Sequence, residues 1–276
     1  MDTEIETVEF AREEQLTHYL LLNAALMPDM GILNGRMKAV LHLLELSRKE
    51  KISFYEDFAI ELLDEILDAV NDDFPVCFGH GLCGIGWGVE YIVKRRLLAV
   101  DEDICAPYDR MVARYVSREH YDGAGVYAGL TGVLLYFLSR IENVCSPSLK
   151  AVTEENKKQI AGIIHRMFRM MTDDFVLQIM QEKDNSDFVM NGVFIYSKWE
   201  YPVILHTLGL VFQHGIERRK TLSLLDRMLR PLRNGKGRLP ESEINRELLN
   251  KTLAYISGLH VSLRGTSGSE PGIERI

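Results

Sequence analysis

The sequence predicts an all-α protein, and three observations support this prediction. Proline is scarce, with eight in 276 residues, so few positions interrupt a helix. Apolar residues recur at helical spacing along most of the chain, whereas the alternation of polar and apolar residues that is typical of strands is hard to find. Short glycine-rich turns also recur at regular intervals, each interval long enough for a pair of helices.

The composition predicts an ordinary globular protein. Hydrophobic residues make up 46% of the chain and charged residues 26%, and we expect a single domain over residues 1–276. The net charge of −8, without a long basic block, argues against a nucleic-acid partner. No apolar run approaches the roughly 20 residues of a spanning helix, so no membrane span is expected.

The amino-terminal residues and the cysteines indicate a cytoplasmic location. Residues 1–6 are acidic and carry no apolar segment of the kind found in a signal peptide. Without such a signal, the four cysteines are expected to be reduced thiols, as in cytosolic proteins.

The apolar spacing predicts ten helices in chain order. Phe58, Leu62, Ile66 and Val70 illustrate the pattern, since they follow one another at four-residue spacing and share one face. The predicted helices span residues 3–27, 35–50, 53–71, 83–97, 101–119, 129–142, 153–182, 200–217, 219–232 and 241–257. Residues 189–196 are the best candidate for a strand.

Three of the glycine-rich turns align with one another. Gly35, Gly81 and Gly129 are 46 and 48 residues apart. Each is followed by a helix that is apolar on most faces and then by a helix with one charged face. A helix that is apolar all round must be buried, whereas a helix with one apolar stripe can cover it from outside. The repeats therefore predict about five helical hairpins, with inner helices ringed by outer ones.

The second turn holds the densest set of chemically versatile side chains. It contains five glycines among residues 79–88 and the sequence Cys77-x-x-His80-x-x-Cys83. Two thiols and an imidazole suit zinc and would leave one coordination position open. The alternative is packing: Cys83 is a small residue at a helix start, Cys77 lies in the core, and His80 lines a cavity.

The turns resemble those of the lanthionine synthetase C-like family. Residues 80–84, His-Gly-Leu-Cys-Gly, are similar to its His-Gly-x-x-Gly motif, and residues 129–132 and 31–35 are similar to its degenerate glycine-rich repeats. The resemblance covers residues 29–142 well. It implies an α/α toroid, closed or open, in which glycine-rich turns begin the inner helices.

The resemblance also implies an activity in peptide modification or maturation. Members of the family use zinc to activate a peptide cysteine, which adds to a dehydrated serine or threonine and forms a thioether. Bound metal lowers the pKa of a thiol, and the thiolate is the nucleophile. The candidate zinc ligands remain Cys77, His80 and Cys83, by their residue types and spacing. His80 also matches a motif position of the family, which makes it the candidate catalytic residue that moves the proton.

Two alternatives to an active or degenerate thioether cyclase stay open. The Trp-Cys and Cys-His-Gly turns that hold zinc in the family are absent from this sequence. Their absence favours a non-catalytic accessory protein that binds a peptide or a partner protein in the same fold. More distantly, toroids of this kind host carbohydrate-active enzymes, which need two carboxylates. Asp29, Asp73 and Asp122 precede the three turns, although helix capping explains such positions more simply.

Overall fold

The computed structural model describes residues 14–100, 102–117, 123–142, 150–181, 189–190, 194–195, 200–236 and 243–266. Helices make up most of these residues, so the all-α prediction is confirmed. Residues 14–23 are helical. They are followed by η1 (Ala24–Leu26), α2 (Arg36–Glu50), α3 (Ser53–Ala69), α4 (Leu82–Arg95), α5 (Ala106–Ser117), α6 (Leu130–Glu142), α7 (Lys150–Met170), α8 (Asp173–Gln181), α9 (Tyr201–Gln213), α10 (Arg218–Arg233) and α11 (Glu243–Thr266).

Three of the predicted helices differ clearly from the observed ones. The last, predicted over 241–257, is α11, which continues to Thr266. The helix predicted over 153–182 is in fact α7 followed by α8, because Thr172 begins a new helix: the Phe175 amide donates to its Oγ1 at 3.2 Å. The helix predicted from residue 101 begins later, at Ala106, where Pro107 fits the first turn of α5.

The predicted extended segment is confirmed. Strand β1 (Val189–Met190) pairs with β2 (Phe194–Ile195) in antiparallel register, with Val189 opposite Ile195. The structure divides into two compact units. Unit 1 holds Met1–Ile163 and Val189–Tyr196, and unit 2 holds Ile164–Phe188 and Ser197–Ile276. A single toroid-like domain over residues 1–276 stays a prediction.

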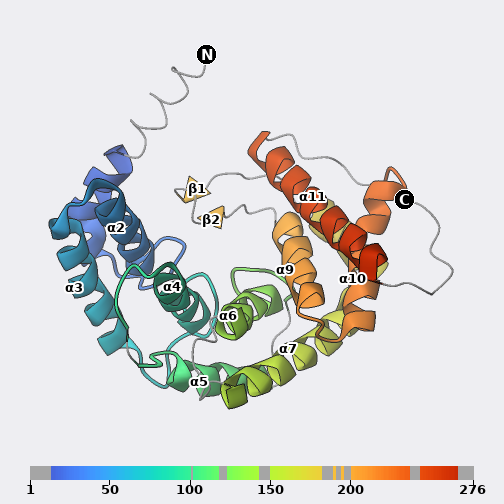
Figure 1. Ribbon diagram of the computed structural model, residues 1–276, viewed down its shortest axis with the longest axis horizontal. Coiled ribbons are helices and arrows are strands. Elements are labelled where there is room, and N and C mark those ends of the chain that lie inside the picture. The colour runs from blue at the N-terminus through green and yellow to red at the C-terminus, as the bar shows by residue number, and fades with distance from the viewer. Residues whose placement is uncertain are drawn as a thin grey trace. The chain divides into compact units, whose positions relative to one another are not determined.

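Unit 1 has inner and outer helices, as the repeats predict. Helix α4 contacts both α2 and α6, while α3 packs on α2 and α5 on α4 (Figure 1). In α6, eleven of the 13 residues are buried. In α3 only Ala59, Leu62, Leu63 and Ile66 are buried, all on the face toward the core. The apolar helices are therefore enclosed, and the amphipathic ones cover them.

The three glycine-rich turns of unit 1 have the same backbone structure. In each, the first residue of the inner helix donates its amide to a carbonyl seven residues earlier, which folds the preceding chain back over the helix start. These bonds join Arg36 to Asp29 (2.9 Å), Leu82 to Pro75 (2.8 Å) and Leu130 to Gly123 (2.8 Å).

The aligned glycines are required by this close approach. A Cβ added to Gly35 would lie 2.4 Å from the Asp29 oxygen, and one added to Gly81 would lie 2.2 Å from the Pro75 oxygen. Real Cβ atoms do not come so near to backbone oxygens, so no larger residue fits without moving the chain. The glycine spacing thus reports where the backbone folds onto itself.

Backbone hydrogen bonds also link the turns to one another. The Leu33 amide donates to the Gly79 oxygen at 3.2 Å, and the Gly79 amide donates to the Tyr127 oxygen at 2.9 Å. Leu33, Gly79 and Tyr127 occupy equivalent positions in their repeats, since they are 46 and 48 residues apart. The turns at residues 29–35, 75–81 and 123–129 therefore form a ladder, which we call the turn ladder.

An ion cluster around the buried Arg140 joins α4, α5 and α6. The Arg140 side chain is 5% exposed and pairs with Glu90 of α4 at 2.5 Å, Asp103 at 2.8 Å and Asp109 of α5 at 2.8 Å. The Tyr136 hydroxyl donates to Asp109 at 2.7 Å. One guanidinium thus satisfies carboxylates from three segments, which fixes α4, α5 and α6 together.

Unit 2 repeats the contrast between apolar and amphipathic helices. Most of α9 is buried, and it packs against α10 and α11, while α8 contacts α10. The Tyr201 hydroxyl, on α9, donates to the Met228 oxygen of α10 at 2.6 Å. None of the helices in the described ranges is both long and apolar enough to cross a membrane.

Candidate functional site

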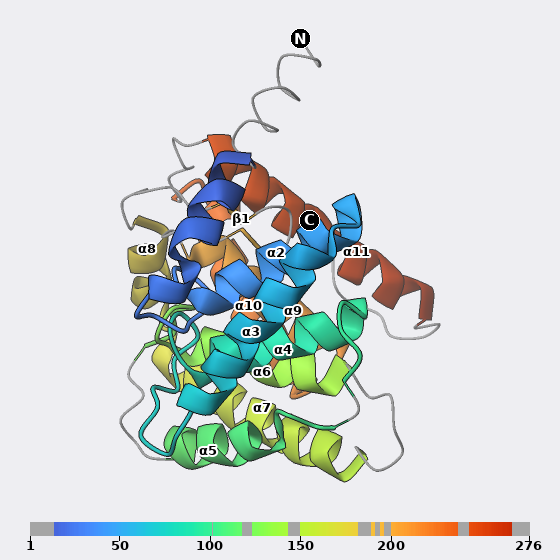
Figure 2. The same cartoon turned by 90° about the vertical axis from the view of Figure 1, so that its left-hand side faces the viewer.

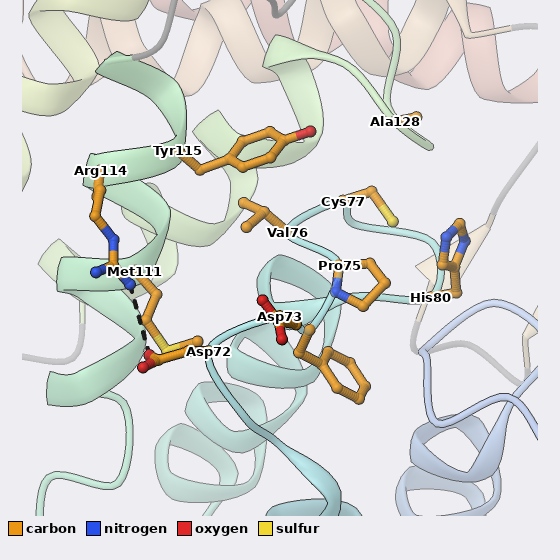
Figure 3. A pocket seen from close by; sticks show the side chains of 11 residues that line it. Asp72, Asp73, Pro75, Val76, Cys77, His80, Met111, Arg114, Tyr115 and Ala128 are labelled. Carbon is orange, nitrogen blue, oxygen red and sulfur yellow. Dashed lines mark ion pairs between the residues drawn. The ribbon is translucent and has the colours of Figure 1, made fainter.

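A solvent-open pocket of about 560 Å³ lies in unit 1 beside the second glycine-rich turn (Figure 3). The segment between α3 and α4 forms one wall and α5 forms another, so the turn ladder and an outer helix both position its side chains. The lining residues are Asp72, Asp73, Phe74, Pro75, Val76, Cys77, His80, Met111, Arg114, Tyr115 and Ala128.

His80, the predicted catalytic residue, lines this pocket. Its Nδ1 is 2.7 Å from the hydroxyl oxygen of Tyr127, and the two ring centroids are 5.2 Å apart. This contact holds the imidazole in place, because Tyr127 belongs to the neighbouring turn of the ladder. Among the described residues, none makes a hydrogen bond to Nε2. His80 therefore has one nitrogen engaged by the protein and one for a ligand.

The contact between His80 and Tyr127 depends on a glycine. A Cβ on Gly79 would lie 2.3 Å from Cε2 of the Tyr127 ring, so a side chain at position 79 would occupy the place of the tyrosine. Burial raises the pKa of the Tyr127 hydroxyl, and the nearby Cys77 and Asp29 add to this effect. The hydroxyl consequently stays protonated at neutral pH and can donate to the imidazole.

Cys77 lines the same pocket and is partly exposed. Figure 3 shows its sulfur on the side of the pocket where the His80 ring lies. Burial raises the pKa of the thiol, and this outweighs the hydrogen bonds from the His80 and Gly79 amides, which lower it. Cys77 is thus a protonated thiol at neutral pH, with amide donors placed to stabilise its thiolate.

Cys83 lies apart from the pocket lining. It is fully buried at the start of α4, and burial raises the pKa of its thiol well above the ordinary value. This placement matches the packing alternative for Cys83. Of the three predicted zinc ligands, the structure therefore places Cys77 and His80 along the pocket and Cys83 in the core.

The three predicted zinc ligands lie in different surroundings. Within the described part of the chain, no three or more His, Cys, Asp or Glu side chains gather as a metal-binding group. Cys77 and His80 have the donor chemistry that zinc prefers, but the buried Cys83 does not join them at the pocket surface. Zinc binding by Cys77, His80 and Cys83 stays a prediction, and no chemical step is routed through it below.

The predicted carboxylates occupy different places. Asp73 lines the pocket. Asp29 instead stabilises its own turn, because its Oδ1 accepts the Gly31 amide at 2.7 Å. Asp122 lies outside the described residues. The described residues therefore bring one of the three carboxylates to the pocket.

Two residues of the candidate site were not predicted from the sequence. The repeat alignment could have indicated Tyr127. It aligns with Gly79 and Leu33 of the other turns, and neither of these is aromatic. Arg114, which pairs with Asp72 at 3.5 Å, has no such signal because it comes from an ordinary amphipathic helix, α5.

Comparison of the chain with protein-family models, with curated proteins and with solved structures finds no match. The pocket must therefore be interpreted from its own side chains. It combines a histidine oriented by a tyrosine, a protonated but accessible thiol, and a carboxylate-rich rim.

Proposed function

We propose that the protein binds a peptide and acts in peptide modification or maturation, as a lanthionine synthetase C-like protein. The observation that carries this proposal is His80, which Tyr127 holds in place, beside Cys77 in an open pocket. His80 lies on the turn whose sequence resembles the His-Gly-x-x-Gly motif of that family. The cytoplasmic location expected from the sequence is part of the same proposal.

The dimensions and chemistry of the pocket suit part of a peptide. A volume of about 560 Å³ is within the usual range for ligand sites and accommodates a few side chains. The Nε2 atom of His80 can donate to or accept from a polar group of the ligand. Val76 and Met111 supply apolar surface, while Asp73 and Arg114 supply charge at the rim. Binding needs no metal and no activated nucleophile.

The first test is protection of Cys77 by a bound peptide. Iodoacetamide should alkylate Cys77 faster than the buried Cys83 and Cys105, since only a thiol that meets solvent can react. A set of synthetic 12-residue peptides is screened for binding, and peptides that bind should slow the alkylation of Cys77 as followed by peptide mapping. If binding peptides leave the alkylation rate unchanged, the pocket is not their site.

Thioether cyclisation is the second candidate, and it is favoured by the unengaged Nε2 of His80. The probe is a peptide that carries one cysteine and one dehydroalanine, incubated with zinc-supplemented protein. Addition of the thiol across the double bond leaves the mass unchanged but makes the peptide resistant to iodoacetamide. His80→Asn should abolish this gain of resistance while peptide binding persists. A rate equal to that of the uncatalysed control would exclude this activity for the probe.

A further inference from the structure

The outer face of α3 carries a straight row of exposed side chains. Phe54, Asp57, Glu61, Asp64 and Asp68 are spaced alternately by three and four residues, so they lie along one stripe of the helix. All five are exposed. Helix α3 lies in front of α2 in Figure 2. We call these residues the α3 row.

The carboxylates of the α3 row lie in a stretch of sequence without positively charged residues. The sequence contains no lysine or arginine between Ile52 and Val93. On the same helix Glu65 pairs with Arg36. Across the ranges that the structure describes, by contrast, no ion pair includes any of the four carboxylates of the row. Like charges at this spacing on a helix repel one another, which a cationic partner would relieve.

Apolar side chains accompany the acidic ones. The Phe54 side chain is 61% exposed, and its ring stacks on that of Phe58 with centroids 6.4 Å apart. Ile52 and Ile60 are 41% and 37% exposed. A face that combines bare aromatic surface with carboxylates suits a partner with both cationic and apolar side chains, since lysine and arginine also bind aromatic rings.

The α3 row leads toward the pocket. Helix α3 ends at Ala69, and the segment that follows contains Asp72 and Asp73, both of which line the pocket. Asp68 lies 14 positions after Phe54 on the helix, a span of about 21 Å, which an extended peptide covers with about six residues. One bound segment can therefore follow α3 and place its end at the pocket.

We propose that the peptide bound by this protein is rich in lysine or arginine and docks along the α3 row, with an apolar side chain on Phe54. This inference rests on the proposed function, because it names the class of peptide that reaches the pocket. The occupant is a separate peptide segment, whose cations meet the carboxylates of the row. A second copy of the chain is the competing occupant, since α10 is rich in arginine.

The test compares two labelled 12-residue peptides in fluorescence anisotropy. One carries lysine at alternate positions and a single tryptophan, and the other has glutamine in place of every lysine. The triple variant Asp57→Asn, Glu61→Gln, Asp64→Asn removes three charges from exposed positions. We expect it to weaken binding of the lysine peptide by about tenfold at low salt, with the loss shrinking as salt screens the charges. The glutamine peptide should bind weakly to both proteins.

A matched control separates docking from net charge. The variant Glu154→Gln, Glu155→Gln, Glu247→Gln also removes three carboxylates, each more than half exposed. It should bind the lysine peptide as the unaltered protein does. If both triple variants weakened binding of the lysine peptide equally, the inference would be overturned, because the peptide would then be attracted by the net charge of the protein and not by the α3 row. Failure of the lysine peptide to bind the unaltered protein would overturn it as well.

Two further measurements assign the occupant and the pocket. Phe54→Ala should weaken binding of the lysine peptide by about threefold or more through lost aromatic contact. If sedimentation instead shows a salt-sensitive dimer that the α3 triple variant abolishes, and the peptide does not bind, the occupant is a second copy and the inference is wrong. If binding of the lysine peptide depends on the α3 row but does not slow the alkylation of Cys77, the docking surface is supported and the proposed function of the pocket is rejected.

Discussion

At the scale of single residues, the candidate site depends on what position 79 lacks. Gly79 leaves room for the Tyr127 ring, and the Tyr127 hydroxyl then holds His80 at 2.7 Å. The imidazole is thus oriented by a residue 47 positions away, through space that a missing side chain provides. Removal of that space should disturb the site and the turn together.

Gly79→Ala tests this dependence. The new Cβ would meet the Tyr127 ring at 2.3 Å, so we expect a loss of about 1–3 kcal/mol in the free energy of unfolding, measured with urea. Tyr127→Ala should remove most of that penalty when the two changes are combined, because the clash is then gone. Additive effects in the double-mutant cycle would show that the ring is not the obstacle.

The pH dependence of Cys77 alkylation is a second prediction at this scale. Because burial raises the pKa of the thiol above its ordinary value, the thiolate is scarce at pH 7. The alkylation rate should therefore rise about tenfold per pH unit from pH 7 to beyond the ordinary pKa of about 8.5. The rates of Cys77 and a free cysteine peptide are compared across this range. A plateau for Cys77 at lower pH than for the peptide would contradict the raised pKa.

At the scale of elements, the inner helices follow directly from the sequence. These helices are apolar on most faces and follow a glycine-rich turn, and both properties can be read from the sequence. Helices α2, α4 and α6 begin within one residue of the predicted positions. The break between α7 and α8 was missed because the apolar pattern continues across it. Only the capping hydroxyl of Thr172 and the acidic pair after it signal a new helix start.

The site was only partly predictable for a related reason. His80 stands out because it adjoins a repeated glycine, and its place on the pocket could be foreseen from the repeat. The partner Tyr127 could not, since the contact arises from the way two turns stack, and helical periodicity says nothing about that register. Cys83 appears beside Cys77 and His80 in the sequence, yet the helix start places it in the core.

Arg140 offers a test of how α4, α5 and α6 are joined. Arg140→Met removes the only cation seen to pair with Glu90, Asp103 and Asp109 in the described structure. The change takes the guanidinium away from buried Glu90 and from the partly buried Asp103 and Asp109, which is costly, so we expect the free energy of unfolding to fall by about 3–5 kcal/mol. Arg110, which is exposed on α5, supplies the matched control. The change Arg110→Met should alter the free energy of unfolding by less than about 0.5 kcal/mol. Similar losses in both variants would argue against the cluster.

At the scale of the whole molecule, several buried acids should make the fold sensitive to alkali. Burial raises the pKa of the Cys83 and Cys105 thiols and of the Tyr136 hydroxyl, and it raises that of Tyr108 to about 12. In the unfolded chain these groups ionise near their ordinary values of about 8.5 for cysteine and 10 for tyrosine. The native state then holds protons that the unfolded state has released.

The sign of the effect follows from these directions. Stability that depends on the protonated forms is complete below about pH 8.5 and is lost as pH rises through the cysteine and tyrosine range. Buried Lys38 has the opposite effect on the pH dependence of stability, because burial lowers its pKa. It is a single group, whereas several thiols and phenols have raised pKa values. Urea midpoints should therefore fall between pH 7.5 and pH 11. A constant midpoint over this interval would contradict the prediction.

In the turn ladder, the backbone stabilises the fold and a side chain serves the candidate site. The ladder's hydrogen bonds join backbone amides to backbone carbonyls, so they do not depend on the side chain that precedes Gly35, Gly81 or Gly129. Asn34, His80 and Ala128 occupy that place in the three turns, and Ala128 lines the same pocket as His80. The position before the glycine can therefore carry a reactive side chain in more than one of the repeats. A histidine at position 128 in place of one at position 80 would keep the imidazole in the pocket while the architecture stays the same.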